Sequence, residues 1–346
     1  MTTARAVSWR RRSPASLWRG LLSPWRTRRL LEAHLLILIV CAAVAATALF
    51  FSYRQTQRGA VALASREAPA VQGLAGTRLA ALRSYQEANA LVVERLADVA
   101  GSGETYRSQL SAASQGLSRI ADRTDQDLGT VNGLLATYGN SLNLGMSVYR
   151  DQPLMRDQKF REAKSLLVRD KVGLAPRLDG LQTTQIRHAE ATATMGDWQR
   201  AGWWLAELAL GALALTLLSA LFVLRDRCGR DWNPYLLATL ALTVALAVVP
   251  VLTTSTTEAD LGAALKDLHR ITDVSGRITD VSAPHKELID AQTSVTQRSE
   301  QVRQRLTDDT WTDRVYRGTF VGGLLIVVLP ALGLGLRLDG DYWRRR

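Results

Sequence analysis

The stretch LLILIVCAAVAATALFF, residues Leu35 to Phe51, holds no charged side chain. A second run, WWLAELALGALALTLLSALFVL from Trp203 to Leu224, holds only Glu207. A helix needs about 20 apolar residues to cross a bilayer, and core helices are rarely apolar over such a length. We therefore predict a membrane span at each place. The segment between them, Ser52 to Arg200, has no comparable run and is predicted to lie in water on one side.

Two further apolar blocks, Tyr235 to Leu252 and Thr319 to Leu336, bring the predicted number of spans to four. The first block could instead be a signal peptide, but Phe50 and Phe51 stand where a cleavage site needs small residues, so we favour a retained anchor. The fold class is then an all-α membrane protein with an extracytoplasmic helical bundle and a second helical hairpin. The boundaries are 1–34 for a cytoplasmic basic arm, 35–51 for span 1, 52–202 for the bundle, 203–224 for span 2, 225–234 for a cytoplasmic hairpin, 235–252 for span 3, 253–317 for the second hairpin, 318–336 for span 4 and 337–346 for a cytoplasmic tail.

Arginine is concentrated in three segments of this plan. Met1 to His34, Arg225 to Asp231 and Arg337 to Arg346 together hold fifteen arginines and five acidic residues, which is +10 of the net charge of +11. All three lie on the same side of a four-span topology, and positive loops stay inside. Both termini are therefore predicted to be cytoplasmic in the plasma membrane. The basic balance does not indicate a nucleic-acid partner, because the rest of the chain is nearly neutral.

The two cysteines are Cys41 in span 1 and Cys228 in the inner hairpin, so they are not expected to pair. The long outer segments hold none, although an exported domain could form disulfides. Helix packing alone must therefore hold the outer part together, and no cysteine-based metal or redox site is expected there.

The outer segment after span 1 has the pattern of amphipathic helices. In LAGTRLAALRSYQEANALVVERLADVA, residues 74–100, leucine and valine recur with a period near 3.6. Turn signals follow at Gly103, Pro153 and Gly173. We predict a bundle of about four helices whose first and last members continue spans 1 and 2 without interruption. A continuous helix can carry a piston, rotation or tilt between two sides of a membrane.

The second outer segment contains a seven-residue repeat, RITDVSG followed at once by RITDVSA, from Arg270 to Ala283. Seven residues correspond to a helical heptad. We therefore predict a helical hairpin that turns at Pro284 and can dock against the first bundle, with an apolar seam formed by Ile271, Val274, Ile278 and Val281. Pro250, near the outer end of span 3, should kink or end that helix.

Aromatic and basic residues around the Pro153 turn suggest a docking face for an acidic partner. The candidate partner-binding residues are Tyr138, Tyr149, Arg150, Arg156, Lys159 and Arg161. The alternative, which we favour, is that the tyrosines fill the core and the charges form a solvated face.

On the inner side, the short hairpin RDRCGRDWNP offers Arg225, Arg227, Arg230 and Trp232 for cytosolic contact, although a simple connector between antiparallel spans is the favoured interpretation. The N-terminal arm has Trp and Leu at helical spacing among its arginines, so a helix on the inner leaflet, a disordered leader and a docking segment stay open. Membrane lipid is thus an expected partner. Glu207 is an intramembrane carboxylate, but its position near the interface allows it to reach water, and we favour no functional role.

Catalytic, cofactor-binding and metal-binding residues are not predicted. His34, His188, His269 and His285 stand apart from other ligand-type residues, and solvated helix positions are expected for the outer three. No phosphate-binding loop, nucleophile elbow or kinase signature is present. The predicted cytosolic segments are too short for a catalytic core, so we expect no enzyme, and one intramembrane charge offers no transport pathway.

The architecture as a whole resembles the tetra-spanning membrane coupling protein of high-GC Gram-positive bacteria. The resemblance covers the basic arm, the segments ALRSYQEANALVVERL (81–96) and LLATYGNSL (134–142), and the shorter second helical loop. That protein relays amino-acid sensing from an extracytoplasmic glutamine/glutamate-binding lipoprotein to a soluble serine/threonine kinase. The resemblance therefore implies an extracytoplasmic solute-binding protein and a cytosolic kinase as partners, and it carries over no binding residue. A span, a helical bundle and a second span also look like the ligand-binding half of bacterial chemoreceptors, but no signalling helix follows here.

We expect a non-enzymatic transmembrane signal coupler that relays amino-acid sensing to a cytosolic kinase. The alternatives are a structural scaffold of a cell-envelope complex and a direct small-molecule sensor of the chemoreceptor type. The sequence leaves open the ligand, the effector and whether the chain forms a homo-oligomer.

Overall fold

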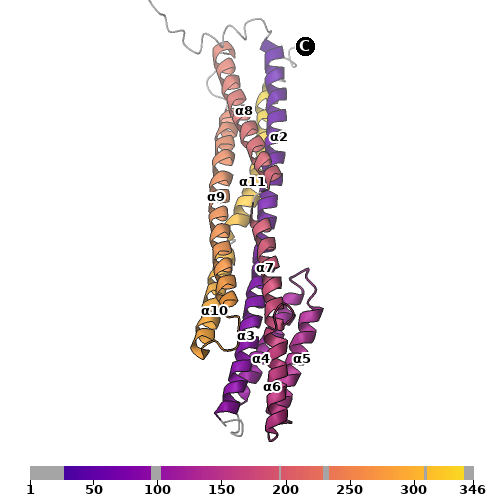
Figure 1. The fold of residues 1–346 in the computed structure, drawn as a ribbon. Coiled ribbons are helices and arrows are strands. Elements are labelled where there is room, and N and C mark those ends of the chain that lie inside the picture. The colour runs from indigo at the N-terminus through magenta and orange to yellow at the C-terminus, as the bar shows by residue number, and fades with distance from the viewer. Residues whose placement is uncertain (1–26, 95–102, 195, 229–233, 308–309, 339–346) are drawn as a thin grey trace, which may run out of the picture. The chain divides into compact units, whose positions relative to one another are not determined.

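The computed structural model describes residues 27–94, 103–194, 196–228, 234–307 and 310–338 (Figure 1). Within these ranges the only regular secondary structure is helical, which confirms the all-α prediction. Most of the predicted N-terminal arm, half of the inner hairpin and most of the C-terminal tail lie outside the described residues.

The chain forms two compact units. Unit 1 contains Met1–Tyr53, Asp197–Leu252 and Arg314–Arg346. Unit 2 contains Arg54–Gly196, called the first segment below, and Thr253–Asp313, called the second segment. Helices α2 (Thr27–Ala62) and α9 (Pro234–Arg277) each cross from one unit to the other as continuous helices.

Unit 1 differs from a water-soluble bundle in having an apolar surface. Of 31 exposed large hydrophobic side chains among the described residues, 25 belong to this unit. Its interior is apolar as well: most of the buried side chains are leucine, with the smaller Ala42, Ala45 and Ala206 among them. Leucine exposed over a whole helix surface is unfavourable in water and neutral in lipid, so this distribution indicates a membrane-embedded unit.

Three stretches are long and apolar enough to cross a membrane: Glu32–Val93, Leu174–Arg225, which is interrupted after Ala193, and Pro234–Arg277. They correspond to predicted spans 1, 2 and 3. In α11 (Thr310–Leu338) the described apolar part, Arg317–Gly333, is shorter. The membrane-protein class is therefore supported, while the fourth span and the orientation stay predictions.

Antiparallel helix pairs hold unit 1 together through small residues and one polar contact. Between α2 and α8 (Asp197–Cys228), His34 Nε2 lies 3.1 Å from Ser219 Oγ near one end. Near the other end, a Cβ added to Gly202 would lie 2.5 Å from Ser52 Oγ. Similarly, a Cβ added to Gly322 of α11 would lie 3.1 Å from Leu246 Cδ2 of α9. Such close approach is the usual basis of helix association in lipid.

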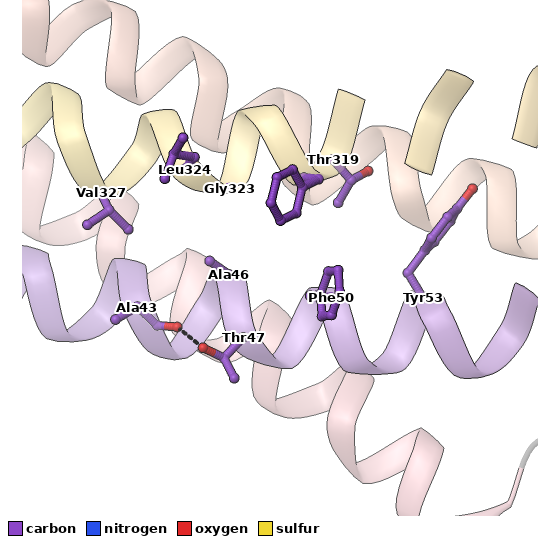
Figure 2. Close-up of a pocket in the computed structure, with 10 residues that line it drawn as sticks. Ala43, Ala46, Thr47, Phe50, Tyr53, Thr319, Gly323, Leu324 and Val327 are labelled. Atoms are coloured by element: carbon purple, nitrogen blue, oxygen red, sulfur yellow. Dashed lines mark hydrogen bonds between the residues drawn. The ribbon is translucent and has the colours of Figure 1, made fainter. Parts of the chain in front are cut away.

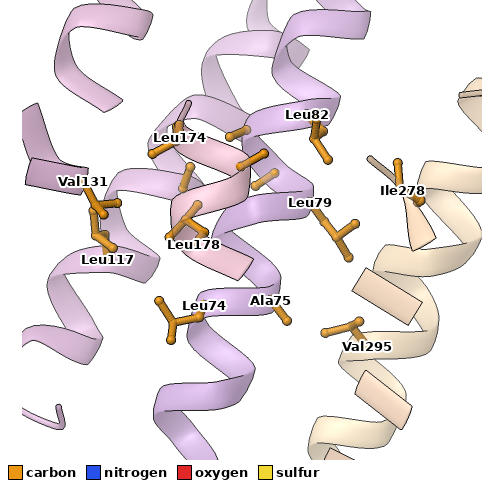
Figure 3. Packing of buried hydrophobic residues seen from close by; sticks show 14 of the residues in the cluster. Leu74, Ala75, Leu79, Leu82, Leu117, Val131, Leu174, Leu178, Ile278 and Val295 are labelled. Atoms are coloured by element: carbon orange, nitrogen blue, oxygen red, sulfur yellow. The ribbon is translucent and has the colours of Figure 1, made fainter. Parts of the chain in front are cut away.

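Unit 2 is a helical bundle arranged around α3 (Ala68–Val93). Figure 3 shows Leu74, Ala75, Leu79 and Leu82 of this helix pointing towards several neighbours. Fourteen residues of α3 are buried, so the helix is central rather than amphipathic. Its neighbours in the first segment are α4 (Glu104–Ala121), α5 (Gly129–Met146), α6 (Pro153–Val168) and α7 (Leu174–Ala193).

The second segment shares this core. It consists of the outer part of α9 and of α10 (His285–Thr307), which contribute Leu268, Ile271, Leu288 and Val295 to the same cluster of buried side chains. The predicted hairpin therefore forms one unit with the bundle instead of a separate domain. Ile278 and Val295 face α3 in Figure 3.

The prediction that the last bundle helix continues unbroken into span 2 is wrong. Helix α7 ends at Ala193, Thr194 is extended with ψ 133°, and α8 begins at Asp197. Gly196 in this connection has no helix-stabilising side chain, and Asp197 is a favourable acidic residue in the first turn of the new helix. Span 1 does continue into unit 2, through the π-helical turn η1 (Leu63–Glu67) and α3.

The prediction for the heptad repeat is half right. The first copy is helical, but α9 ends at Arg277, so the second copy forms the turn. Ile278 and Val281 are still buried in the core. The turn is stabilised by Asp280, which accepts hydrogen bonds from Val281 N (2.7 Å) and Ser282 Oγ (2.7 Å) and thereby competes with helix formation.

Pro250 lies inside α9 and does not end it. A proline removes one backbone donor, and a membrane helix tolerates this when neighbours satisfy the freed carbonyl. The helix consequently runs from the apolar block into unit 2.

Candidate functional site

The turn between α5 and α6 gathers five of the six predicted partner-binding residues. Tyr149 and Arg150 lie in the turn after α5, and Arg156, Lys159 and Arg161 lie on α6. A hydrogen bond from Arg156 Nη1 to the carbonyl of Arg150 (3.3 Å) connects the two groups. This end of unit 2, called the tip below, is also where α3 ends and α4 begins (Figure 1).

Tyr138 does not belong to the tip surface. Its side chain is fully buried, and its hydroxyl bonds Ser84 Oγ (2.7 Å) and donates to the carbonyl of Ala81 (3.1 Å). Burial raises the pKa of this phenol. A partner cannot contact a residue in this position, so Tyr138 is a core residue, as the alternative interpretation expected.

The charges at the tip are partly neutralised within the chain. Lys159 Nζ lies 2.7 Å from Glu162 Oε2, and Ser141 Oγ donates to Glu162 Oε1 at 3.1 Å. These hydrogen bonds lower the pKa of Glu162, and Glu162 raises the pKa of Lys159. Lys159 is thus already paired, and Arg156 lies 3.7 Å from Asp157. Arg150 and Arg156 are half-buried, and Arg161 is exposed.

The tip also exposes large apolar side chains that sequence analysis did not single out. Leu154 is 85% exposed and Val148 is 61% exposed, and Met155 lies beside them in sequence. Outside the membrane-type unit such exposure is uncommon, so it adds an apolar component to the basic face. Leu154 directly follows Pro153 at the start of a helix, and this position was the one sequence feature that could have pointed to its exposure.

A buried polar network joins the two segments of unit 2. Arg78 of α3 is 3% exposed and donates to the carbonyls of Ser275 and of Ile278 (3.1 Å to the latter), at the end of α9. Its guanidinium also lies 3.4 Å from Asp179. Burial lowers the pKa of Arg78, and Asp179 opposes this shift. Arg78 therefore takes the place of the missing helical donors where α9 stops.

The histidines of the second segment are half-exposed, but they are paired. His269 Nε2 lies 2.8 Å from Glu190 of α7, and His285 Nε2 lies 3.6 Å from Glu87 of α3. Each pair connects the second segment to the first. His188, His269 and His285 are all exposed on helices, as expected, and the last two also face a carboxylate of the first segment.

Two of the four predicted cytosolic contact residues lie outside the described part of the chain. Arg225 is exposed near the end of α8, and Arg227 lies on the same helix. Arg230 and Trp232 lie outside the described residues. The structure therefore brings no inner contact surface together.

Glu207 is half-buried on α8. Its Oε1 and the indole nitrogen of Trp203, one turn earlier, are buried without a hydrogen-bond partner among the described residues. Two unsatisfied groups one turn apart need water or lipid headgroups, which agrees with a position near the interface.

An apolar groove of about 350 Å³ lies between α2 and α11 in unit 1 (Figure 2). Ala46 and Gly323 form its floor by close approach, and Phe50 and Phe320 line it further along. No charged residue lines it, so it suits an apolar chain such as a lipid tail and not a polar solute.

Among the described residues, no three His, Cys, Asp or Glu side chains gather as a metal site would require. No family model matches the chain, and no curated protein or solved structure is detectably similar to it.

Proposed function

We propose that this protein is a non-enzymatic transmembrane signal coupler that relays extracytoplasmic amino-acid sensing to a cytosolic kinase. One observation carries the proposal: the helical path α2–η1–α3 and helix α9 each run from unit 1, with its apolar surface, into unit 2. A continuous helix can transmit a small displacement that a flexible linker would absorb.

The tip of unit 2 is the proposed docking face for an exported solute-binding protein. It combines exposed Leu154 and Val148 with Arg150, Arg156 and Arg161. An apolar centre with arginine around it is a common composition for a protein-binding surface. The overall resemblance to the tetra-spanning coupling family supports the same two partners.

The relay requires that the partner bind one conformation of unit 2 better than another. Coupling between two sites typically amounts to about 1–3 kcal/mol, which shifts populations by about 5- to 150-fold. The break between α7 and α8 and the continuity of α2 favour a relative shift of these two helices as the conformational change.

Disulfide crosslinking in cells can detect such a shift, because the structure provides close pairs at both ends of α2 and α8. Ser52→Cys with Gly202→Cys reports one end, and His34→Cys with Ser219→Cys reports the other, after Cys41→Ser and Cys228→Ser remove the native thiols. We expect oxidation rates at both pairs to change when glutamine or glutamate is added.

Unchanged rates would favour the structural scaffold. A change that persists in cells lacking every exported solute-binding protein would favour direct sensing by unit 2. Replacement of the exposed tip residue Leu154 by Asp should abolish the change under the proposal. Leu208→Ala provides the control, because Leu208 is exposed on the apolar surface of α8. Its crosslinking rates should still change when the amino acid is added.

A further inference from the structure

Three arginines of the second segment converge on one carboxylate. Asp267 of α9 lies 3.3 Å from Arg270 Nη1, 3.7 Å from Arg298 Nη1 and 3.8 Å from Arg305 Nε. Arg298 and Arg305 are seven residues, or about two turns, apart on α10. They therefore lie on the same face of the helix, and both side chains reach Asp267. We call this group the arginine cluster.

The arginine cluster is not a set of fully formed salt bridges. On the same helix, Arg303 holds Glu300 with two short hydrogen bonds of 2.9 and 2.7 Å, the preferred fork geometry of a guanidinium. In the cluster, only Arg270 comes within hydrogen-bond distance of Asp267. Arg298 and Arg305 are held near the carboxylate at distances that leave most of their donors unused.

The charge and the burial of the cluster also indicate that its arginines are not fully neutralised. Counted over the described residues alone, three guanidiniums and one carboxylate leave a local excess of two positive charges, and Glu300 is taken by Arg303. The Asp267 side chain is only 7% exposed, while Arg298, Arg305 and Arg270 are 31%, 46% and 49% exposed. Nε of Arg298 and Oδ2 of Asp267 are buried without hydrogen-bond partners among the described residues. The unpartnered Nε of Arg298 is costly to bury and favours an additional acceptor, whereas the unpartnered Oδ2 of Asp267 is itself an acceptor and has Arg305 Nε 3.8 Å away.

We propose that the arginine cluster is a binding site for a small oxyanion with two negative charges. Such a dianion balances the local excess charge and accepts from the forks of Arg298 and Arg305, which suit planar carboxylates and phosphates. Asp267 holds the arginines together from the buried side, and the ligand binds from the open side.

The dianion could be a free solute or the headgroup phosphate of a lipid. Asp267 stands fifteen residues beyond Leu252, the last residue of the apolar block, which is about 22 Å of α9 at 1.5 Å per residue. This length favours a dissolved anion. The proposal does not depend on the signalling partners named above.

Isothermal titration calorimetry tests the site with the full-length protein in phosphatidylcholine nanodiscs. Inorganic phosphate is the probe, and chloride at equal ionic strength is the blank. We expect saturable binding that Arg298→Gln and Arg305→Gln each weaken by about tenfold. The double variant Glu300→Gln with Arg303→Gln is the matched control, because it removes a paired acid and base from the same helix without changing the net charge, and it should bind as the wild type does.

Asp267→Asn should bind phosphate more tightly, because a competing negative charge is removed. Absence of saturable phosphate heat in the wild type would overturn the proposal, as would equal affinity in wild type and both single arginine variants. The same titration in nanodiscs containing phosphatidylglycerol separates the two sources. Unchanged phosphate affinity supports a dissolved anion, and competition by the anionic lipid would replace it with a headgroup.

Discussion

Arg78 is the residue at which the two segments of unit 2 depend most directly on each other. Arg78→Met keeps an apolar stem of similar length but leaves the carbonyls of Ser275 and Ile278 without this donor. We expect a loss of about 2–4 kcal/mol in stability, because two buried acceptors become unsatisfied. Hydrogen–deuterium exchange should show faster opening at the end of α9 before any change in α5.

The matched control is Arg119→Met on α4, an exposed arginine in the same unit. A surface substitution of this kind should change stability by about 0.5 kcal/mol or less. Equal protection of the α9 end in wild type and Arg78→Met would show that the carbonyls are satisfied in another way.

Glu67 gives a pH-dependent prediction. Burial raises its pKa above the ordinary 4.5, and the charge of Arg66 and a hydrogen bond from Gln185 only partly oppose this. A carboxyl with a raised folded-state pKa stabilises the fold when protonated, and this stability is lost as pH rises above about 4.5. Glu67→Gln should therefore be more stable than the wild type at about pH 7.

That advantage should shrink towards about pH 4, where Glu67 is protonated in both folded and unfolded chains. Thermal unfolding of the purified protein across this range measures it. An advantage of Glu67→Gln that is constant with pH would mean that ionisation of Glu67 is not its cause.

At the residue scale, the sequence could not separate buried from exposed polar residues. Tyr138 and Tyr149 look alike in a helical pattern, but only the packing of α3 against α5 decides that Tyr138 is inside. Asp267 and its arginines were missed because the contact joins two helices. The seven-residue spacing of Arg298 and Arg305 was visible, but the face of α9 opposite them was not.

At the element scale, the pairing of α3 with α4 depends on glycine at the contact. A Cβ at Gly73 would collide with Ile120 Cγ2, and one at Gly116 would lie 2.5 Å from Thr77 Oγ1. Gly73→Val should therefore force the two helices apart and destabilise unit 2 by about 1–3 kcal/mol. Thermal unfolding and exchange protection of α4 check this.

Gly76 provides the control on the same helix, since no atom lies within 4 Å of its added Cβ. Gly76→Ala should stabilise α3 by about 0.5–1 kcal/mol, because alanine loses less backbone entropy than glycine. If both substitutions destabilise equally, helix contact is not the reason.

The order and type of most helices followed from periodicity and turn residues, but two ends did not. The repeat at Arg270 to Ala283 predicts two helical heptads, yet Asp280 and the carbonyl-binding Arg78 end the helix between them. The break after Ala193 was also missed, because its residues are acceptable within a helix. Both outcomes depend on tertiary contacts that no local pattern records.

At the scale of the whole molecule, three of the four predicted spans correspond to helices long and apolar enough to cross a membrane, and the fourth span stays a prediction. The apolar blocks reappear as exposed apolar helices in unit 1, because hydrophobicity over a long stretch does not depend on tertiary context. The orientation follows only from arginine counts. Gly103→Cys and Pro284→Cys should therefore react with a membrane-impermeant maleimide on intact cells, in chains lacking the native cysteines.

Arg225→Cys, near the end of α8, should react only after permeabilisation. It is exposed, so a lack of reaction in intact cells reports sidedness and not burial. The reverse labelling pattern would invert the topology and rule out an outer partner at the tip.

The final prediction concerns why three of the four connections between the units are continuous helices, in α2, α9 and α11, and one is not. If α9 transmits displacement as a rigid rod, two glycines inserted between Thr256 and Thr257 should decouple its two parts, since glycine disfavours helix and adds flexibility. The ligand-dependent change in crosslinking of His34→Cys with Ser219→Cys should then be lost. The same insertion after Gly196, where the chain is already non-helical, should be tolerated. Loss of response at both positions would mean that α7 and α8 also act as one rod, and retention at both would exclude transmission through α9.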